Sequence, residues 1–407
     1  MNVRITVLSV WGLAGVVTVA TISAIWATRK PAPARPVPSM SGEAQFVAQW
    51  VDRGLLRLAE QDVEAPSSVA DAGVDDSFAG VESADDPHSA ASGRDADLLT
   101  PGGPESVIEG ALSAQRARLY RRLSFEFGLN EDQLSALRAI IDASPYFGEG
   151  NPRVSVHPMS REECHERRAL APLAKDDSKI CGAPNMVALF DAERQDPSSA
   201  RVCIDQFEFP NLPCEYPIVW VRANEAARIC RIFDKRLCDA HEWEGACAGK
   251  LRSPGKEYES WASRQLAELL HNQAREWIWA TGVKPDRRLC ATGALKSPGC
   301  VDASWEECGT NSYPAGAFPR CVSPFGVYDM HGNVAEHMNL PVLEDQLGAR
   351  GGSGETEMKG SWFAFDEYHP HPDDCRWRAP SWHATPVESP LSHFNYHLGF
   401  RCCKDLD

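Results

Sequence analysis

The stretch Phe325–Glu336, FGVYDMHGNVAE, decides how the C-terminal half of this sequence is interpreted. Its last five residues, Gly332–Glu336, offer an amide oxygen, a carboxylate and backbone carbonyls within one turn. Hard oxygen ligands at such close spacing suit Ca²⁺. The stretch is therefore a candidate calcium loop. The alternative is that its polar side chains only bond to loop amides.

This stretch belongs to the third of four segments that occur in a fixed order. The first is Cys203–Glu208 (CIDQFE), and the second is Tyr216–Val221 (YPIVWV), which runs into a helix that ends at KRL, with EWE shortly after it. The third begins with Pro314–Gly316 (PAG), with eight residues between it and Phe325. The fourth is Lys359–Trp362 (KGSW), which closes with Leu398–Arg401 (LGFR).

Together the segments resemble the sulfatase-modifying factor family, that of the formylglycine-generating enzyme and its ergothioneine- and pyoverdine-pathway relatives. The resemblance covers roughly residues 200–404. It implies an α+β, formylglycine-generating-enzyme-like fold related to C-type lectins, with much irregular backbone held by calcium and disulfides. It also assigns a structural calcium ion to Asn333 and Glu336, with backbone carbonyls near Gly332 and Val334.

The family's copper-dependent members use two cysteines placed after the G-S-[WY] turn, and paired thiolates suit Cu(I). In this chain the corresponding positions are Ala364 and His369. An insertion over 367–374 could bring Cys375 to the second position, but nothing replaces the first. The sequence therefore predicts that copper is absent and that formylglycine chemistry is lost. Cys375 is instead expected to form a disulfide, with Cys402 or Cys403 as candidate partners.

The iron-dependent relatives draw ligands from a helical domain with closely spaced histidines, and the helices expected over 104–143 contain none. His369, His371 and Asp373, beside Cys375, are the remaining candidate transition-metal ligands. The alternative is an ordinary polar loop. His337 is a candidate general base because its unperturbed pKa is near neutrality, although packing is the commoner role of a lone histidine. Ser361, in the Gly-Ser-Trp turn, is a weaker catalytic candidate.

All fourteen cysteines lie between Cys164 and Cys403, with no C-x-x-C pair, which is typical of a disulfide framework rather than a zinc site. The uncharged run Ile5–Ala27 is long enough, at roughly 1.5 Å per residue, to cross a bilayer as a helix. These features predict an extracytoplasmic protein, periplasmic or at the cell surface, anchored through an N-terminal transmembrane helix. If the run is instead a cleaved signal, the protein is secreted.

The predicted organisation has five parts: a signal anchor over 1–30, a disordered linker over 31–103, a helical hairpin over 104–145, a cysteine-containing connection over 146–199 and the main domain over 200–407. The linker is rich in Pro and Ala and then strongly acidic. Gly128 and Asn130 mark the hairpin turn, Asn224 is expected to cap one later helix, and Asp239 with Glu242 forms a capping box for another.

The net charge of −16 argues against a nucleic-acid partner. The favoured function is a non-catalytic binding or structural module with a peptide or protein ligand. The first alternative is a metal-dependent oxidoreductase with a rearranged site that uses Cys375, His369 and His371. A hydrolase is disfavoured because the sequence has no G-x-S-x-G or H-E-x-x-H motif.

Overall fold

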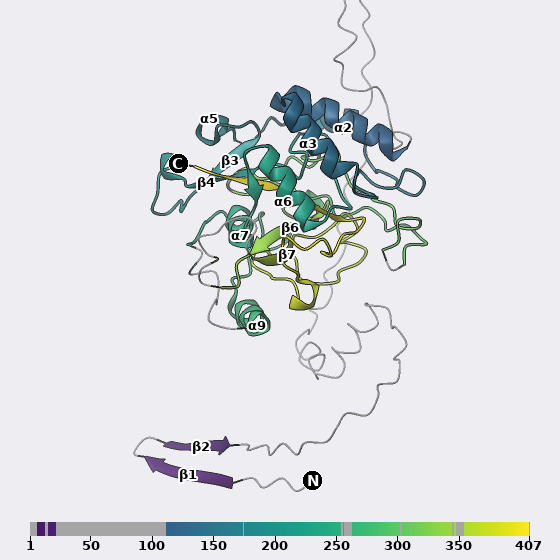
Figure 1. Ribbon diagram of the computed structural model, residues 1–407. Helices are drawn as coiled ribbons and strands as arrows, with labels where there is room; N and C mark the ends of the chain where they lie inside the picture. Colours follow the sequence, from purple (N-terminus) through teal and green to yellow (C-terminus); the bar gives the residue numbers. More distant parts are fainter. Residues whose placement is uncertain are drawn as a thin grey trace, which may run out of the picture. The chain divides into compact units, whose positions relative to one another are not determined.

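The computed structural model describes residues 6–12, 15–21 and 111–406, except for 174, 254, 256–262, 302, 344–345 and 347–353 (Figure 1). Two compact units, Met1–Ala79 and Gly80–Asp407, divide the chain. The predicted linker over 31–103 lies outside the described residues.

The N-terminal unit contains an antiparallel hairpin where a transmembrane helix was expected. Strand β1 (Thr6–Gly12) pairs with β2 (Gly15–Thr21), in a register that sets Thr6 opposite Thr21. The expected helix is therefore wrong over these residues. The segment is rich in valine and threonine, which favour strands, and glycines stand at both ends of the short connection. Among the helices that the structure describes, none has both the length and the apolar character needed to cross a membrane.

The second unit begins with two helices, α2 (Leu112–Phe127) and α3 (Glu131–Ile141). Gly128 ends α2 in a left-handed conformation, and Asn130 caps α3 through a reciprocal capping box with Gln133, as the sequence predicts. Helix α3 packs against α6 (Ala223–Ile232) and α2 packs against α3, and the buried leucine and isoleucine side chains of both helices belong to one hydrophobic cluster with α6. The predicted cap of α6 is wrong by two residues, because the N-cap is Arg222 rather than Asn224.

The remaining helices are short. Among the described residues they are α4 (Arg161–Leu170), α5 (Ser178–Cys181), α7 (Ala240–Ala248), α9 (Arg264–Ala274) and the 3₁₀ turns η2 (Pro197–Ser199), η3 (Arg287–Leu289) and η5 (Ser381–His383). The capping box predicted for Asp239 and Glu242 is present at the start of α7. Every residue of α7 from Ala240 to Cys247 is buried, so this helix forms part of the centre of the unit.

Two small sheets complete the unit (Figure 1). The first is antiparallel, in the order β3 (Met186–Leu189), β4 (Val202–Asp205), β9 (Cys402–Asp405), β5 (Arg236–Leu237). The second has β6 (Ala335–Leu340) at its centre, antiparallel to β7 (Glu355–Lys359) and parallel to β8 (Leu398–Phe400). Long irregular segments connect these elements. The result is the mixed helix and strand architecture with much irregular backbone that the resemblance implies.

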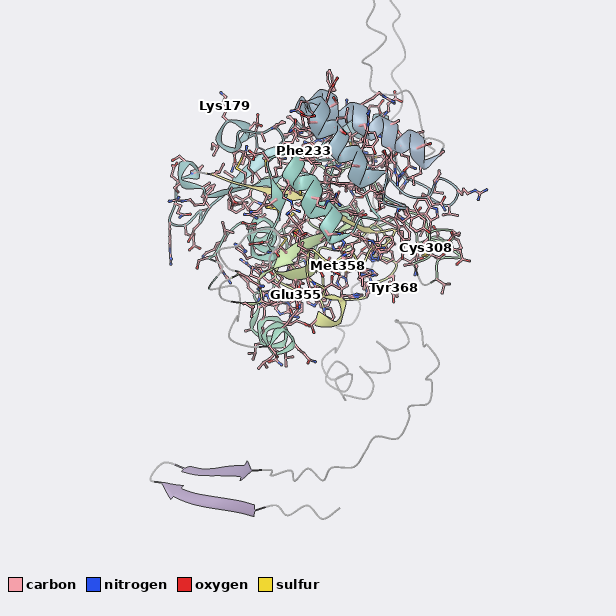
Figure 2. The ribbon with its side chains drawn as sticks, viewed as in Figure 1. Lys179, Phe233, Cys308, Glu355, Met358 and Tyr368 are labelled. Carbon is pink, nitrogen blue, oxygen red and sulfur yellow. A yellow bond between two sulfur atoms is a disulfide. The ribbon has the colours of Figure 1, made fainter. Side chains whose placement is uncertain are left out.

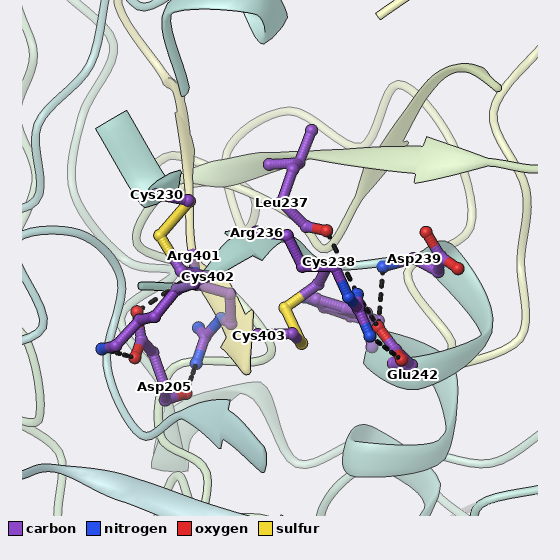
Figure 3. Close-up of a disulfide and its surroundings, with 12 residues drawn as sticks. Asp205, Cys230, Arg236, Leu237, Cys238, Asp239, Glu242, Arg401, Cys402 and Cys403 are labelled. Atoms are coloured by element: carbon purple, nitrogen blue, oxygen red, sulfur yellow. Dashed lines mark hydrogen bonds and ion pairs between the residues drawn. A yellow bond between two sulfur atoms is a disulfide. The ribbon is translucent and has the colours of Figure 1, made fainter. Parts of the chain in front are cut away.

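Seven disulfides hold the irregular backbone together, and they use all fourteen cysteines. The pairs are Cys164–Cys214, Cys181–Cys203, Cys230–Cys402, Cys238–Cys403, Cys247–Cys375, Cys290–Cys321 and Cys300–Cys308. Figure 3 shows adjacent Cys402 and Cys403 leaving β9 in different directions, because successive strand residues point to opposite faces. Such a framework is typical of an oxidising compartment.

Candidate functional site

The carboxylate of Glu336, predicted as a calcium ligand, is bound by an arginine. Its Oε2 accepts from Arg401 Nε at 2.6 Å and its Oε1 accepts from Arg401 Nη2 at 2.5 Å. The indole nitrogen of Trp243 donates to the same carboxylate at 3.1 Å. Both partners of the ion pair are almost completely buried. A bidentate pair of this kind satisfies both carboxylate oxygens.

Asn333 is also fully engaged with protein groups. Its Nδ2 donates to Glu208 Oε2 at 2.7 Å, and its Oδ1 accepts from the backbone N–H of Tyr313 at 2.9 Å. The backbone of Asn333 has a positive φ of 56°, which asparagine tolerates better than most residues. The side chain therefore holds the loop in place, and its oxygen does not fit a calcium ligand in this geometry.

The same region contains more buried negative charge than positive charge. Glu208, Asp329 and Glu336 are all buried. The guanidinium of Arg401 contacts one of these carboxylates, that of Glu336, directly. Burial, followed by repulsion from Asp329 and Glu336, raises the pKa of Glu208 well above its usual value. Burial likewise raises the pKa of Asp329 to about 6. We call these three residues the acid group.

Asp329 has one carboxylate oxygen without a partner. Its Oδ2 accepts from the backbone N–H of Gly316 at 2.6 Å, whereas its buried Oδ1 has no hydrogen bond. A buried polar atom in this state calls for an explanation, such as an ion. The excess charge and the free Oδ1 fit a divalent cation, although the side chain of Asn333 does not. The sequence reasoning missed Glu208 and Asp329, although both lie inside motifs that it had selected.

Cys375 pairs with Cys247, not with Cys402 or Cys403 as expected. Strand β9 directs its two cysteines to α6 and to the start of α7, so neither can reach Cys375. His331 Nε2 lies 3.5 Å from Cys247 Sγ and accepts from the backbone N–H of Ala280. The structure contains no free cysteine, and all fourteen lie in the part of the chain that it describes. Ala364 is buried. These residues do not fit a copper ion held by two thiolates.

The three other predicted metal ligands each contact different residues. His369 is exposed, with its ring 4.7 Å from that of Phe365, and His371 stacks on Trp377 with ring centroids 4.2 Å apart. Asp373 accepts from Arg287 Nη2 at 3.0 Å and from the indole of Trp279 at 3.0 Å. None of the metal-sized groups found among the described residues includes these side chains.

The two remaining catalytic candidates make structural contacts. Ser361 Oγ accepts from the backbone N–H of Gly332 at 2.8 Å. His337 lies on β6, buried, with Nε2 3.0 Å from the carbonyl oxygen of Val221. Burial, and then the nearby His393, lowers the pKa of His337 to about 3. His337 is therefore a neutral imidazole at physiological pH.

His337 also lines a small half-open pocket beside the second sheet. His383 and His393 line it together with Arg264, Glu357 and Met358. Figure 2 labels Met358 and Glu355 on β7, the strand that forms one wall. The sequence analysis did not select His383 or His393, because they are distant in sequence from His337 and from each other.

Residues 190–406 match the family described as the sulfatase-modifying factor enzyme 1-like domain. The chain belongs to this family. No curated protein matches this chain. Among solved structures, that of CarF is 13% identical with a TM-score of 0.28, over 61% of this chain and 84% of that chain. The family match covers both sheets except β3, which ends one residue before it, and it includes the acid group, the pocket and Cys375.

Proposed function

We propose that this sulfatase-modifying factor-like domain is a non-catalytic recognition module that acts in an extracytoplasmic, oxidising compartment. The observation that carries the proposal is the complete use of cysteine: fourteen cysteines form seven disulfides and leave no thiolate. A soft metal ion that activates oxygen through a pair of thiolates then has no ligands in this domain. The alternative oxidoreductase that used Cys375 as a ligand loses its sulfur for the same reason.

The half-open pocket supports recognition of a peptide or protein ligand. Its walls combine apolar side chains, such as Met358 and Leu398, with the ion pair between Arg264 and Glu357. Sites of this kind bind a side-chain-sized group through apolar contact and orient it with a few polar atoms.

Two measurements on the full chain test the loss of catalysis. A peptide with the pattern C-x-P-x-R, copper and O₂ should give no oxidation of its cysteine above a protein-free control. Titration of the denatured, unreduced chain with a thiol reagent should give close to zero thiols. Clear turnover, or about two reactive thiols per chain, would overturn the proposal.

We also propose a structural calcium ion at the acid group, with Asp329 Oδ1 as its first ligand. The support is the excess of buried carboxylate over guanidinium and the unpartnered oxygen. An ion that binds only the folded state, at a free concentration of about 100 times its Kd, adds about 2.7 kcal/mol to the free energy of unfolding. We therefore expect Ca²⁺ to raise the melting temperature measured in a chelator, and no change would contradict this proposal.

A further inference from the structure

Several histidines gather around the half-open pocket, although they come from separate parts of the chain. His337 on β6, His383 in η5 and His393 line it, and His397, which does not line it, follows His393 in the segment that leads into β8. His383 and His397 each interact electrostatically with His393 and with His371. The fold thus assembles an imidazole-rich site that no local sequence spacing reveals.

Two of these imidazoles direct lone pairs toward one point. The amide nitrogen of Asn395 lies 2.9 Å from His393 Nε2 and 3.3 Å from His397 Nε2. Since the amide N–H groups are donors, both Nε2 atoms act as acceptors and carry no proton. The amide orientation is fixed independently, because Asn395 Oδ1 accepts from the backbone N–H of His397 at 3.0 Å. The point at which the lone pairs meet is therefore suited to an electrophile.

A second pair of rings has the spacing of imidazoles that share one ion. The ring centroids of His383 and His393 lie 5.2 Å apart. Two imidazoles bound to one tetrahedral ion, with bonds of about 2.0–2.1 Å, have centroids about 5 Å apart. His393 therefore belongs to both arrangements and is the centre of the group.

The rings are chemically ready to bind and can be reached from solvent. The hydrogen bonds from Asn395 leave His393 Nε2 and His397 Nε2 without a proton. A neutral imidazole is the form that binds metal ions. All three side chains are partly exposed, and His397 Nδ1 has no hydrogen-bond partner.

We propose that His383, His393 and His397 bind a divalent transition-metal ion such as Cu²⁺ or Zn²⁺. No three ring nitrogens of these residues lie within 4.8 Å of one another in the described part of the chain. Ligation therefore requires the rings to turn toward one another, with Asn395 displaced as the hydrogen-bond donor. This site is distinct from the acid group, because imidazole suits transition metals and carboxylate oxygens suit Ca²⁺. The proposal does not depend on whether the domain is catalytic.

The test uses the full chain purified without a polyhistidine tag. Calorimetric titration with Cu²⁺ or Zn²⁺ at neutral pH should show saturable binding of one ion per chain, and Ca²⁺ should not compete for it. The electron paramagnetic resonance spectrum of the Cu²⁺ form should show splitting from at least two nitrogen ligands. The combined substitutions His383→Gln and His393→Gln should weaken affinity by at least about tenfold.

Two exposed histidines supply matched controls. His369→Gln and His165→Gln change imidazoles that do not line the pocket, so both variants should bind the metal as the unaltered protein does. An equal affinity in the double variant, or a loss in either control, would overturn the proposal. If the double variant does not fold, the spectrum of the unaltered protein decides: oxygen ligands alone, or no binding, would reject the site.

Discussion

Two buried carboxylate sites of the same domain respond to burial in opposite ways. Glu244 on α7 lies 2.6 Å from Lys359 Nζ and 3.3 Å from Arg378 Nε. Burial acts to raise its pKa, but these cations outweigh burial and lower it to about 2. Asp329 is equally buried, lies among other carboxylates, and has its pKa raised to about 6. The comparison shows that the cations in contact with a buried carboxylate, and not burial itself, decide the sign of the shift.

Of the two carboxylate sites, the acid group is the one that lacks positive charge. Glu244 has more cations around it than its own charge requires. In the acid group, by contrast, only Glu336 contacts the guanidinium of Arg401 directly. A missing positive charge is what a bound cation would supply. Substitutions at the two sites should therefore change the free energy of unfolding in opposite directions and by different amounts.

The largest effect is expected at Glu244. The substitution Glu244→Gln removes the carboxylate that contacts buried Lys359 and Arg378 directly, so the free energy of unfolding should fall by about 3–5 kcal/mol. Urea denaturation at pH 7 measures it. Glu306→Gln, at an exposed position, is the matched control and should change little. A loss below about 1 kcal/mol at Glu244 would contradict the assigned network.

At Asp329 the expected effect has the opposite sign. Asp329→Asn keeps an oxygen to accept from Gly316 and removes a buried negative charge. In a chelator at pH 7.5 the free energy of unfolding should rise by up to about 3 kcal/mol, because two pKa units correspond to about that much. The same substitution should abolish the stabilisation by Ca²⁺. A variant that is destabilised in the chelator and still responds to Ca²⁺ would show that Asp329 is not the ligand.

The pH dependence separates the two sites. The folded state binds more protons than the unfolded state at Asp329 between its usual pKa of 3.8 and about 6, so this residue lowers stability as pH rises through that window. At Glu244 the unfolded state binds more protons between about 2 and 4.5, so stability is lost as pH falls there. Melting curves across pH should lose the upper slope in Asp329→Asn and the lower slope in Glu244→Gln. Unchanged slopes would reject these assignments.

The smallest effect is expected at an exposed ion pair. Arg231 Nη1 lies 3.4 Å from Glu388 Oε1, and the two side chains are 54% and 56% exposed. Since water screens such a pair, Arg231→Ala should change the free energy of unfolding by no more than about 0.5 kcal/mol. A change of 2 kcal/mol or more in the same urea experiment would contradict the expectation that this exposed ion pair contributes little to the free energy of unfolding.

Sequence reasoning succeeded where the decisive contacts are close along the chain. It placed the caps of α3 and α7 and the end of α2, and it identified the family from four ordered segments. It also anticipated a disulfide framework from cysteine content. It missed by two residues at the cap of α6, where Arg222 precedes a helix that starts one residue before Asn224. It was wrong about a helix over Thr6–Gly12 and Gly15–Thr21, because apolar length alone does not separate a helix from two valine-rich strands.

What the sequence determined by itself is the family, the class of fold and the absence of the cysteine pair after the Gly-Ser-Trp turn. The tertiary structure decided which charges and sulfurs meet. Cys247 and Cys375 are 128 residues apart, and Asn333 lies 125 residues from Glu208. Caps and turns depend on sterics and hydrogen bonds within a few residues, so sequence reveals them. Partners across such distances are fixed only when the whole chain packs and each buried polar group must find what remains within reach.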